Sequence, residues 1–243
     1  MSLESVLITG ANRGIGLELV RQLLDAPVPP RCVIATTRQI NNNDLEVLRL
    51  KHPNKLHLLQ LEVTNYDSYA TFADRVKRIV GVKGLDTLIN NAGARLAKNL
   101  DDVNPADMVD NFKLNSLTGL MLTKALLPVL KVAALQRKTL VVNMTSRLGS
   151  ITMTGQGGAG IIYPTRTSRA ALNMITKCLS IDLKPYSIYV IGCNPGHVRT
   201  AGGGPTAPLD VETSVAGIIK VIQSVNGQVL GQTISYDGTV VPN

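Results

Sequence analysis

Seven short apolar segments alternate with stretches of helical periodicity along this chain of 243 residues, and the alternation limits the fold more than any other feature. The segments are rich in Val, Ile and Leu, and they comprise Ser5–Thr9, Cys32–Thr36, Leu56–Val63, Leu85–Ile89, Thr139–Met144, Ser187–Cys193 and Gln232–Tyr236. Near-continuous apolar runs are typical of strands that are buried on both faces, as in a parallel sheet.

The stretches between these segments carry apolar residues at the spacing of amphipathic helices. They predict helices over Gly14–Asp25, Tyr66–Val80, Met108–Val132, Thr167–Leu183 and Val211–Ser224, with Thr64 and Asp210 as N-caps of two of them. Strand and helix in alternation indicate βαβ units. We therefore predict an α/β fold with a Rossmann-like, doubly wound parallel sheet of about seven strands. Helices cover both faces, and a single domain spans residues 1–243.

The composition is that of a globular protein, because 44% of the residues are hydrophobic and only 17% are charged. No uninterrupted apolar run reaches the roughly 18 residues of a membrane span, and we expect neither a signal peptide nor a membrane partner. Cys32, Cys178 and Cys193 lie in apolar stretches without the spacing of a metal or redox site. We expect three reduced, buried thiols, no metal site and a cytoplasmic protein.

The net charge of +8 raises the question of an anionic partner. The densest basic group consists of Arg75, Lys77 and Arg78 in a predicted helix, with Lys83 in the loop after it. A solvated helix face explains this group, so we expect no nucleic-acid partner.

A glycine-rich turn, Thr9-Gly10-Ala11-Asn12-Arg13-Gly14-Ile15-Gly16, joins the first predicted strand to the first predicted helix. A phosphate needs backbone N–H groups at close range, without a Cβ atom in the way. Gly10 permits the sharp turn, and Gly14 lets a pyrophosphate lie at the helix N-terminus, where the helix dipole favours negative charge. Gly16 lets the helix lie close to the sheet. The turn predicts a dinucleotide site, with an ordinary strand–helix turn as the alternative.

The spacing G-x-x-x-G-x-G resembles that of the short-chain dehydrogenase/reductase family, and further motifs extend the resemblance over almost the whole chain. Asn90-Asn91-Ala92-Gly93 resembles the family's motif after the fourth strand, and Pro195–Thr200 resembles its loop around the nicotinamide amide. The pieces GSI, RTSRAALN, PTAPLDV and YDGT resemble the sniffer-type and C-factor-like carbonyl reductases. The resemblance implies a nicotinamide cofactor that is held by Gly10, Asn12, Arg13, Gly14, Ile15, Gly16, Asn91, Ala92, Gly93, Pro195, Gly196, Val198 and Thr200.

The residues after the second predicted strand favour NADP(H). An acidic residue there would accept the ribose hydroxyls of NAD, but the chain reads Ala35-Thr36-Thr37-Arg38. Arg38 can form paired hydrogen bonds with a 2′-phosphate, and family members with a basic residue at the place of Arg13 direct it to the same region. The alternative is that Arg38 is an ordinary surface residue. Glu62-Val63 resembles the family's adenine-contacting Asp-Val pair.

The resemblance also implies a catalytic group, and here the chain departs from the family. The family pairs Tyr and Lys four residues apart on a helix: the lysine lowers the pKa of the proton-donating tyrosine and holds the nicotinamide ribose. The register of the following Ala-Ala-Leu-Asn places Arg169 at the lysine position and Thr165 at the tyrosine position. Tyr163 is an alternative donor, but its partner four residues on is the uncharged Thr167.

The other two catalytic residues of the family have counterparts. Asn115 resembles the asparagine that helps to hold a proton-relay water, and Ser146 resembles the serine that hydrogen-bonds the substrate oxygen. Purely structural roles, in a helix and at a strand end, are the alternatives. Arginine keeps the positive charge, whereas a threonine hydroxyl is shorter and far less acidic than a phenol. Loss of a general acid lowers a rate roughly 10²–10⁴-fold.

Three functions follow from these patterns. The first is an NADPH-dependent reductase of small ketones, aldehydes or quinones, weak because of Thr165 and Arg169. The second is an NADP(H)-binding protein with little or no turnover that acts as a sensor, scaffold or partner. The third, a nucleic-acid-binding module, rests on net charge alone. We expect the loops Gly155–Gly160 and Ala201–Pro208 to shape the pocket. The resemblance further implies a homodimer through the two long central helices.

Overall fold

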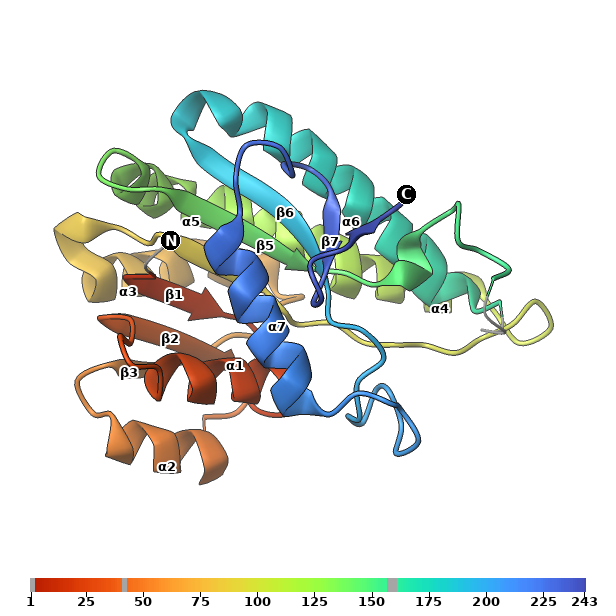
Figure 1. Ribbon diagram of the computed structural model, residues 1–243, viewed down its shortest axis with the longest axis horizontal. Coiled ribbons are helices and arrows are strands. Elements are labelled where there is room, and N and C mark those ends of the chain that lie inside the picture. The colour runs from red at the N-terminus through yellow and green to blue at the C-terminus, as the bar shows by residue number, and fades with distance from the viewer. Residues whose placement is uncertain (1–2, 41–42, 157–160) are drawn as a thin grey trace.

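The computed structural model describes residues 3–40, 43–156 and 161–243, and its centre is one sheet in the order β3-β2-β1-β4-β5-β6-β7-β8 (Figure 1). The strands are β1 (Ser5–Ile8), β2 (Cys32–Thr37), β3 (Leu56–Gln60), β4 (Thr87–Asn90), β5 (Thr139–Met144), β6 (Ile188–Asn194), β7 (Thr233–Ser235) and β8 (Val240–Val241). The pairs from β1 to β7 are parallel, whereas β8 runs antiparallel to β7. The predicted α/β fold with a Rossmann-like sheet is confirmed. The sheet has one strand more than the seven predicted, because the two residues of β8 are too few to show a strand pattern.

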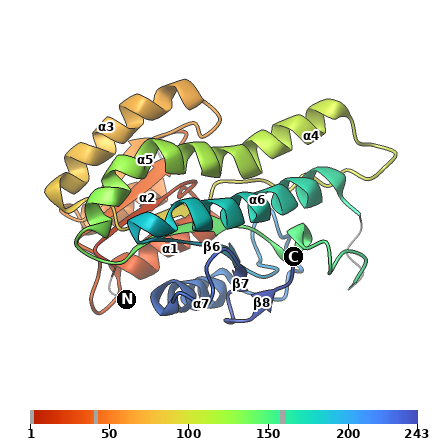
Figure 2. The same ribbon diagram turned by 90° about the horizontal axis from the view of Figure 1, so that it is seen from above.

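Helices cover both faces of the sheet (Figure 2). One face carries α1 (Gly14–Leu24), α2 (Asn43–Lys51) and α7 (Val211–Ser224). The other carries α3 (Tyr69–Val80), α5 (Thr118–Ala134) and α6 (Tyr163–Asp182). The sequence pattern missed α2. Its Leu45 and Leu48 are buried while Val47 and Leu50 are exposed, so apolar residues on both sides hide the helical period.

The predicted helix over Met108–Val132 is a longer helical stretch in three parts. α4 (Pro105–Phe112) passes through a π-helical turn, Lys113–Leu117, into α5, and α4 lies beside α6. By length and composition this stretch could cross a membrane. However, Leu122, Leu126 and Leu130 are fully buried in the core, as in an internal helix of a globular fold.

Two smaller expectations are wrong. Thr64 does not cap a helix: its hydroxyl donates to Glu62, while the 3-10 turn Tyr66–Ser68 follows Asn65 and α3 follows Ser68. Cys178 is exposed on the outer side of α6, whereas Cys32 and Cys193 are buried as expected. Burial raises the pKa of Cys32 to about 11 and that of Cys193 to about 12.

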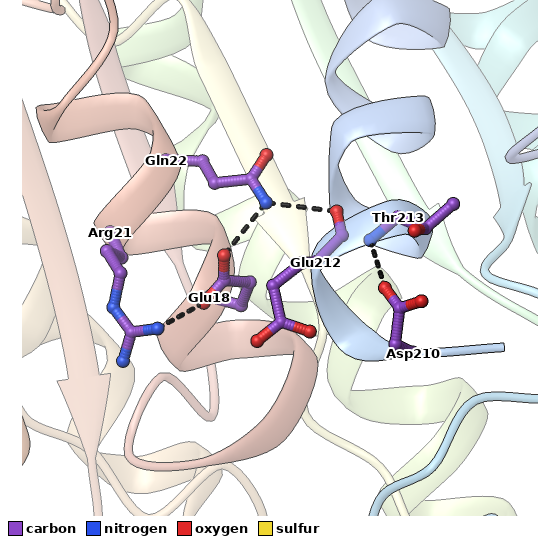
Figure 3. A network of polar contacts seen from close by, with 6 residues as sticks. All are labelled: Glu18, Arg21, Gln22, Asp210, Glu212 and Thr213. Carbon is purple, nitrogen blue, oxygen red and sulfur yellow. Dashed lines mark hydrogen bonds and ion pairs between the residues drawn. The ribbon is translucent and has the colours of Figure 1, made fainter.

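A polar network joins the middle and C-terminal part of α1 to the start of α7 on one face of the sheet (Figure 3). The buried Glu18 accepts hydrogen bonds from Arg21 at 2.7 Å and from Gln22 at 2.8 Å, and Gln22 also donates to the Glu212 carbonyl at 3.0 Å. Asp210 caps α7, as predicted, by accepting from the Thr213 N–H at 2.6 Å. The bond from Gln22 keeps the start of α7 near the C-terminal end of α1.

A buried carboxylate joins β4 to β1. Asp86 Oδ2 accepts from the Ser5 N–H at 2.8 Å, the Glu4 N–H at 3.1 Å and the Ser5 hydroxyl at 3.1 Å. Burial raises the pKa of Asp86, and the hydrogen bonds from Thr87 and Ser5 oppose that shift. The carboxylate therefore holds the first residues of the two central strands in register, with Val6 opposite Thr87.

We expect Asp86→Ala to lower the free energy of unfolding by roughly 2–4 kcal/mol, because one unsatisfied buried donor costs about 1–3 kcal/mol and several donors lose their acceptor. Urea denaturation followed by circular dichroism measures the change. Asp74→Ala, at an exposed position of α3, is the control and should change little. Equal stability of both variants would contradict a role for Asp86 in strand pairing.

Candidate active site

The sequence-predicted residues gather where the strand order reverses. β1 and β4 are neighbours in the sheet, although the chain first builds β2 and β3 on the other side of β1. At such a point the loops after two adjacent strands run in opposite directions, and this opens a crevice outside the carboxyl ends of the strands. The glycine turn follows β1, the Asn90–Gly93 motif follows β4, and Ser146 follows β5. The loop Pro195–Thr200 follows β6.

The glycine turn has the geometry of a dinucleotide cradle. Gly10 and Gly14 have φ angles of 63° and 54°, in the left-handed region that favours glycine. A Cβ atom on Gly16 would lie 2.3 Å from the Gly10 carbonyl oxygen. Arg13 is the N-cap of α1 and makes no side-chain capping bond, so it supplies no acceptor to the first-turn N–H groups. Free N–H groups at a helix N-terminus fit a phosphate.

Thr9 and Asn91 join the glycine turn to the loop after β4. The Thr9 hydroxyl accepts from the N–H groups of Asn91 and Ala92, both at 2.9 Å. The Asn91 side chain donates back to the carbonyls of Thr9 at 2.8 Å and Gly10 at 3.2 Å. A Cβ atom on Gly10 would lie 3.1 Å from Ala92 Cα, so the two backbones touch. The turn and the loop after β4 thus form one surface.

Asn115 holds the next part of that loop. It lies in the π-helical turn, a feature that is frequent at functional sites. Its Oδ1 accepts from the Ala94 N–H, and its Nδ2 donates to the Ala94 carbonyl, both at 2.9 Å. Nδ2 also lies 2.8 Å from Asn111 Oδ1 and 3.0 Å from Ser168 Oγ. Asn115 therefore positions backbone rather than standing free in the site.

Ser146 follows β5 and is half-buried. Its hydroxyl caps the 3-10 turn Arg147–Gly149 by accepting from the Leu148 N–H at 3.1 Å. Ser146 thus has the structural role, at the end of a strand, that the sequence analysis gave as the alternative to a catalytic one. This bond uses a lone pair of the hydroxyl, so the proton stays available for another acceptor.

Arg169 lies on α6 and points toward the loop after β4. Its Nη1 donates to the Met144 carbonyl at 2.6 Å. A Cβ atom on Gly93 would lie 2.7 Å from Arg169 Nη2 and 2.9 Å from Asn115 Oδ1, so the guanidinium covers Gly93. Burial lowers the pKa of Arg169 to about 10, which leaves the group charged at neutral pH.

Thr165 is buried one helical turn before Arg169 and binds backbone. Its hydroxyl accepts from the Leu96 N–H at 2.8 Å and donates to the Leu96 carbonyl at 3.0 Å. Tyr163 begins α6, and its N–H donates to the Lys98 carbonyl at 3.0 Å. Two residues correspond to roughly 200° around a helix, so Tyr163 leaves α6 on the side away from Thr165. The structure brings Thr165, not Tyr163, onto the face of Arg169.

The loop after β6 reaches the glycine turn. A Cβ atom on Gly14 would lie 3.4 Å from Thr200 Cγ2, and Gly196 has a φ angle of 84°. Arg199 closes the loop by donating to the carbonyls of Ala207 at 2.9 Å and Pro208 at 3.0 Å. The Val198 backbone forms an isolated bridge with Leu209. The other loop that was expected to shape the pocket is Gly155–Gly160, and its residues 157–160 lie outside the described part of the chain.

The predicted adenosine contacts lie along the same edge of the sheet. Arg13 and Arg38 are exposed after β1 and β2. Glu62 is exposed after β3, and Val63 is buried in the core beside it. The remaining two predicted residues, Asn12 and Ile15, are half-buried in and after the glycine turn.

Sequence reasoning missed three residues of the site. Thr9 stood inside the glycine motif without a role, yet it anchors the loop after β4. Asn111 and Ser168 are buried and bond to each other at 3.0 Å, and both contact Asn115. A weak signal existed, since Asn111 is polar and lies one helical turn before Asn115.

Comparison with known proteins identifies the family. The profile of the short chain dehydrogenase family matches residues 4–208, and the chain belongs to this family. C-signal of Myxococcus xanthus is 43% identical over 159 residues, which are 65% of this chain and 92% of C-signal. The carbonyl reductase Sniffer of D. melanogaster has a TM-score of 0.94 at 37% identity, over 100% of both chains. An NADPH-bound carbonyl reductase from chicken fatty liver has a TM-score of 0.95 at 36% identity, also over 100% of both. The predicted sniffer-type and C-factor-like resemblance is confirmed.

We expect Thr165→Val to lower the free energy of unfolding by about 1–3 kcal/mol, because the N–H and carbonyl of Leu96 both lose a buried partner. Thr167→Val is the matched control: it is the same substitution on the same helix, but its exposed hydroxyl bonds only within α6. Thermal and urea unfolding compare the two variants. If the control is destabilised as much as Thr165→Val, the bonds to Leu96 are not the cause.

Proposed function

We propose that this protein binds NADP(H) and reduces small carbonyl compounds slowly. The observation that carries the proposal is the cradle formed by the glycine turn and the loop after β4, in which a Cβ atom on Gly10 or Gly16 would meet backbone. Such a surface lets the pyrophosphate of a dinucleotide approach the protein backbone closely. The NADPH-bound carbonyl reductase from chicken fatty liver, similar over its whole length, supports the same cofactor here.

The two exposed arginines at this edge support NADP(H) over NAD(H). Arg13 and Arg38 follow adjacent strands, β1 and β2, and no acidic residue stands among residues 35–38. A guanidinium can bind a 2′-phosphate through two charge-assisted hydrogen bonds.

The residues of the crevice supply part of the chemistry of carbonyl reduction. A bound reduced nicotinamide would supply the hydride. Ser146 keeps a hydroxyl proton to donate in a hydrogen bond to the carbonyl oxygen, and Arg169 adds a positive charge. Donors aimed at a developing oxyanion lower the barrier. The rate is slow because the Thr165 hydroxyl, at the tyrosine position of the sequence register, is bonded to Leu96.

The same bonds of Thr165 favour a second candidate function. A protein whose proton-donor position serves to hold a loop can bind NADP(H) without turnover and act as a sensor or scaffold. The two functions share the cofactor and differ only in whether hydride is transferred.

We also propose a homodimer through α4, α5 and α6. Support comes from large apolar side chains that these helices expose, which include Val109, Phe112, Met174 and Ile181. Exposed apolar groups on neighbouring helices are typical of an interface.

We expect Arg38→Asp to weaken NADPH binding by roughly 10- to 100-fold, because a charge-assisted hydrogen bond contributes about 1.5–3 kcal/mol. NADH binding should change much less. Titration of the nucleotide fluorescence measures both affinities. Arg31→Asp makes the same charge change before β2, at the opposite end of the strand, and is the control. Equal losses for NADPH and NADH would remove Arg38 from the phosphate site.

We expect the purified protein to bind NADPH and to oxidise it slowly with a carbonyl substrate. Ser146→Ala should lower kcat by roughly 10²-fold without changing NADPH affinity, since removal of one oxyanion donor has an effect of about that size. Ser146→Thr keeps a hydroxyl and should restore part of the rate. NADPH binding without any oxidation would favour the non-catalytic function.

A further inference from the structure

The hydroxyl protons on the inner side of α6 are already used within the protein. Thr165 Oγ1 donates to the Leu96 carbonyl at 3.0 Å, and Ser168 Oγ lies 3.0 Å from Asn111 Oδ1 and 3.1 Å from the Thr165 carbonyl. A hydroxyl has only one proton to donate. Neither residue therefore holds a free proton for a substrate oxygen.

Tyr163 does not replace these donors. It lies roughly 200° around α6 from Thr165, on the side of the exposed Thr167. Its backbone N–H is held by the Lys98 carbonyl, so the first turn of α6 is anchored in this orientation. The side chain of Tyr163 thus leaves the helix on the side away from the face that carries Thr165 and Arg169.

What remains in the described part of the crevice can stabilise negative charge without giving up a proton. Ser146 keeps its hydroxyl proton because the bond from Leu148 uses only a lone pair. The Arg169 guanidinium lies against Gly93, and it is held there by the Met144 carbonyl. Met144, whose carbonyl holds Arg169, precedes Ser146 by two residues, so the donor and the cation lie at the same end of β5. Groups of these two kinds can stabilise an oxyanion. The Ser146 hydroxyl is a far weaker acid than a phenol, and the Arg169 guanidinium, with a pKa of about 10, keeps its charge at neutral pH.

We propose that the protein reduces those acceptors whose reduced oxygen is a weakly basic anion, and discriminates against acceptors that need a proton during hydride transfer. This rests on the proposed reductase function. The hydride passes from the reduced nicotinamide to the acceptor, and the nicotinamide is oxidised. In a ketone the hydride adds to the carbonyl carbon, and the electron pair of the C=O π bond moves to oxygen. In a quinone it adds to one oxygen, and the π electron pairs shift through the ring to the other oxygen, which becomes the anion. Ser146 and Arg169 hold the resulting anion, and water protonates it afterwards.

The basicity of the product defines the acceptor class. A hydride added to a quinone gives the monoanion of a hydroquinone, a phenol, and the phenol of tyrosine has a pKa of about 10. A ketone with a strongly electron-withdrawing α-substituent, such as a trifluoromethyl group, gives an alkoxide of reduced basicity. An ordinary ketone gives a strongly basic alkoxide, which forms readily only when an acid protonates it in the transition state.

The test compares acceptors in the parent protein and in the double variant Thr165→Tyr with Arg169→Lys, which supplies a phenol and its lysine. We expect kcat with acetophenone to rise by about 10²-fold or more in the variant, as for a restored general acid. With trifluoroacetophenone and a naphthoquinone, the rise should stay below about tenfold, because little proton transfer is needed. Each acceptor is compared with itself, so its intrinsic electrophilicity cancels.

Separate measurements distinguish the ways in which the proposal can fail. An equal gain for all acceptors overturns it, whereas NADPH binding by the parent, seen in fluorescence, without oxidation by any acceptor contradicts the reductase function on which it rests. No NADPH binding by the parent contradicts the proposed function itself. If the variant does not fold or does not bind NADPH, the solvent isotope effect on the parent protein is measured instead. The kcat of the parent with trifluoroacetophenone should be the same in heavy water as in ordinary water. Slower turnover in heavy water would show that a proton moves in the transition state and would overturn the proposal.

Discussion

The bond between Thr9 and the loop after β4 is the contact on which the rest of the site depends. A parallel sheet with reversed strand order brings the ends of β1 and β4 together, but adjacency alone leaves two loops free to diverge. The Thr9 hydroxyl accepts from two successive N–H groups, and Asn91 returns two bonds to the glycine turn. The glycines matter because of this contact, since Gly10 touches Ala92 and a side chain there would separate the loops.

The same loop is clamped twice more as it leaves β4, first at Ala94 by Asn115 and then at Leu96 by Thr165. Each clamp binds both the N–H and the carbonyl of one residue. A hydroxyl that makes two such bonds cannot also protonate a substrate. In the function that we propose, Thr165 orders this loop at the position where a general acid would stand, so loop order and proton donation compete for one residue.

The sequence predicts the fold well because buried parallel strands and amphipathic helices leave periodic patterns. The sequence did not predict α2, because its exposed Val47 and Leu50 obscure the helical period. It did not predict β8 either, because two residues are too few to show a pattern. The glycine positions were readable, since a left-handed φ or a close backbone contact demands that residue type. The contacts of Thr9, Asn111 and Ser168 were not, because they join residues about 50 to 80 positions apart and follow only from the tertiary structure.

Thr165 and Arg169 separate two properties that a tyrosine–lysine pair would join. Arg169, with a pKa of about 10, stays charged through the neutral range and keeps an electrostatic surface beside Gly93. In the function that we propose, Thr165 leaves this charge in place and removes the acid alone. Electrostatic stabilisation needs a fixed charge, whereas protonation needs an acid whose pKa is near the working pH. In the function that we propose, cofactor binding and oxyanion stabilisation therefore persist while proton transfer is left to water, and the basicity of the product sets the rate.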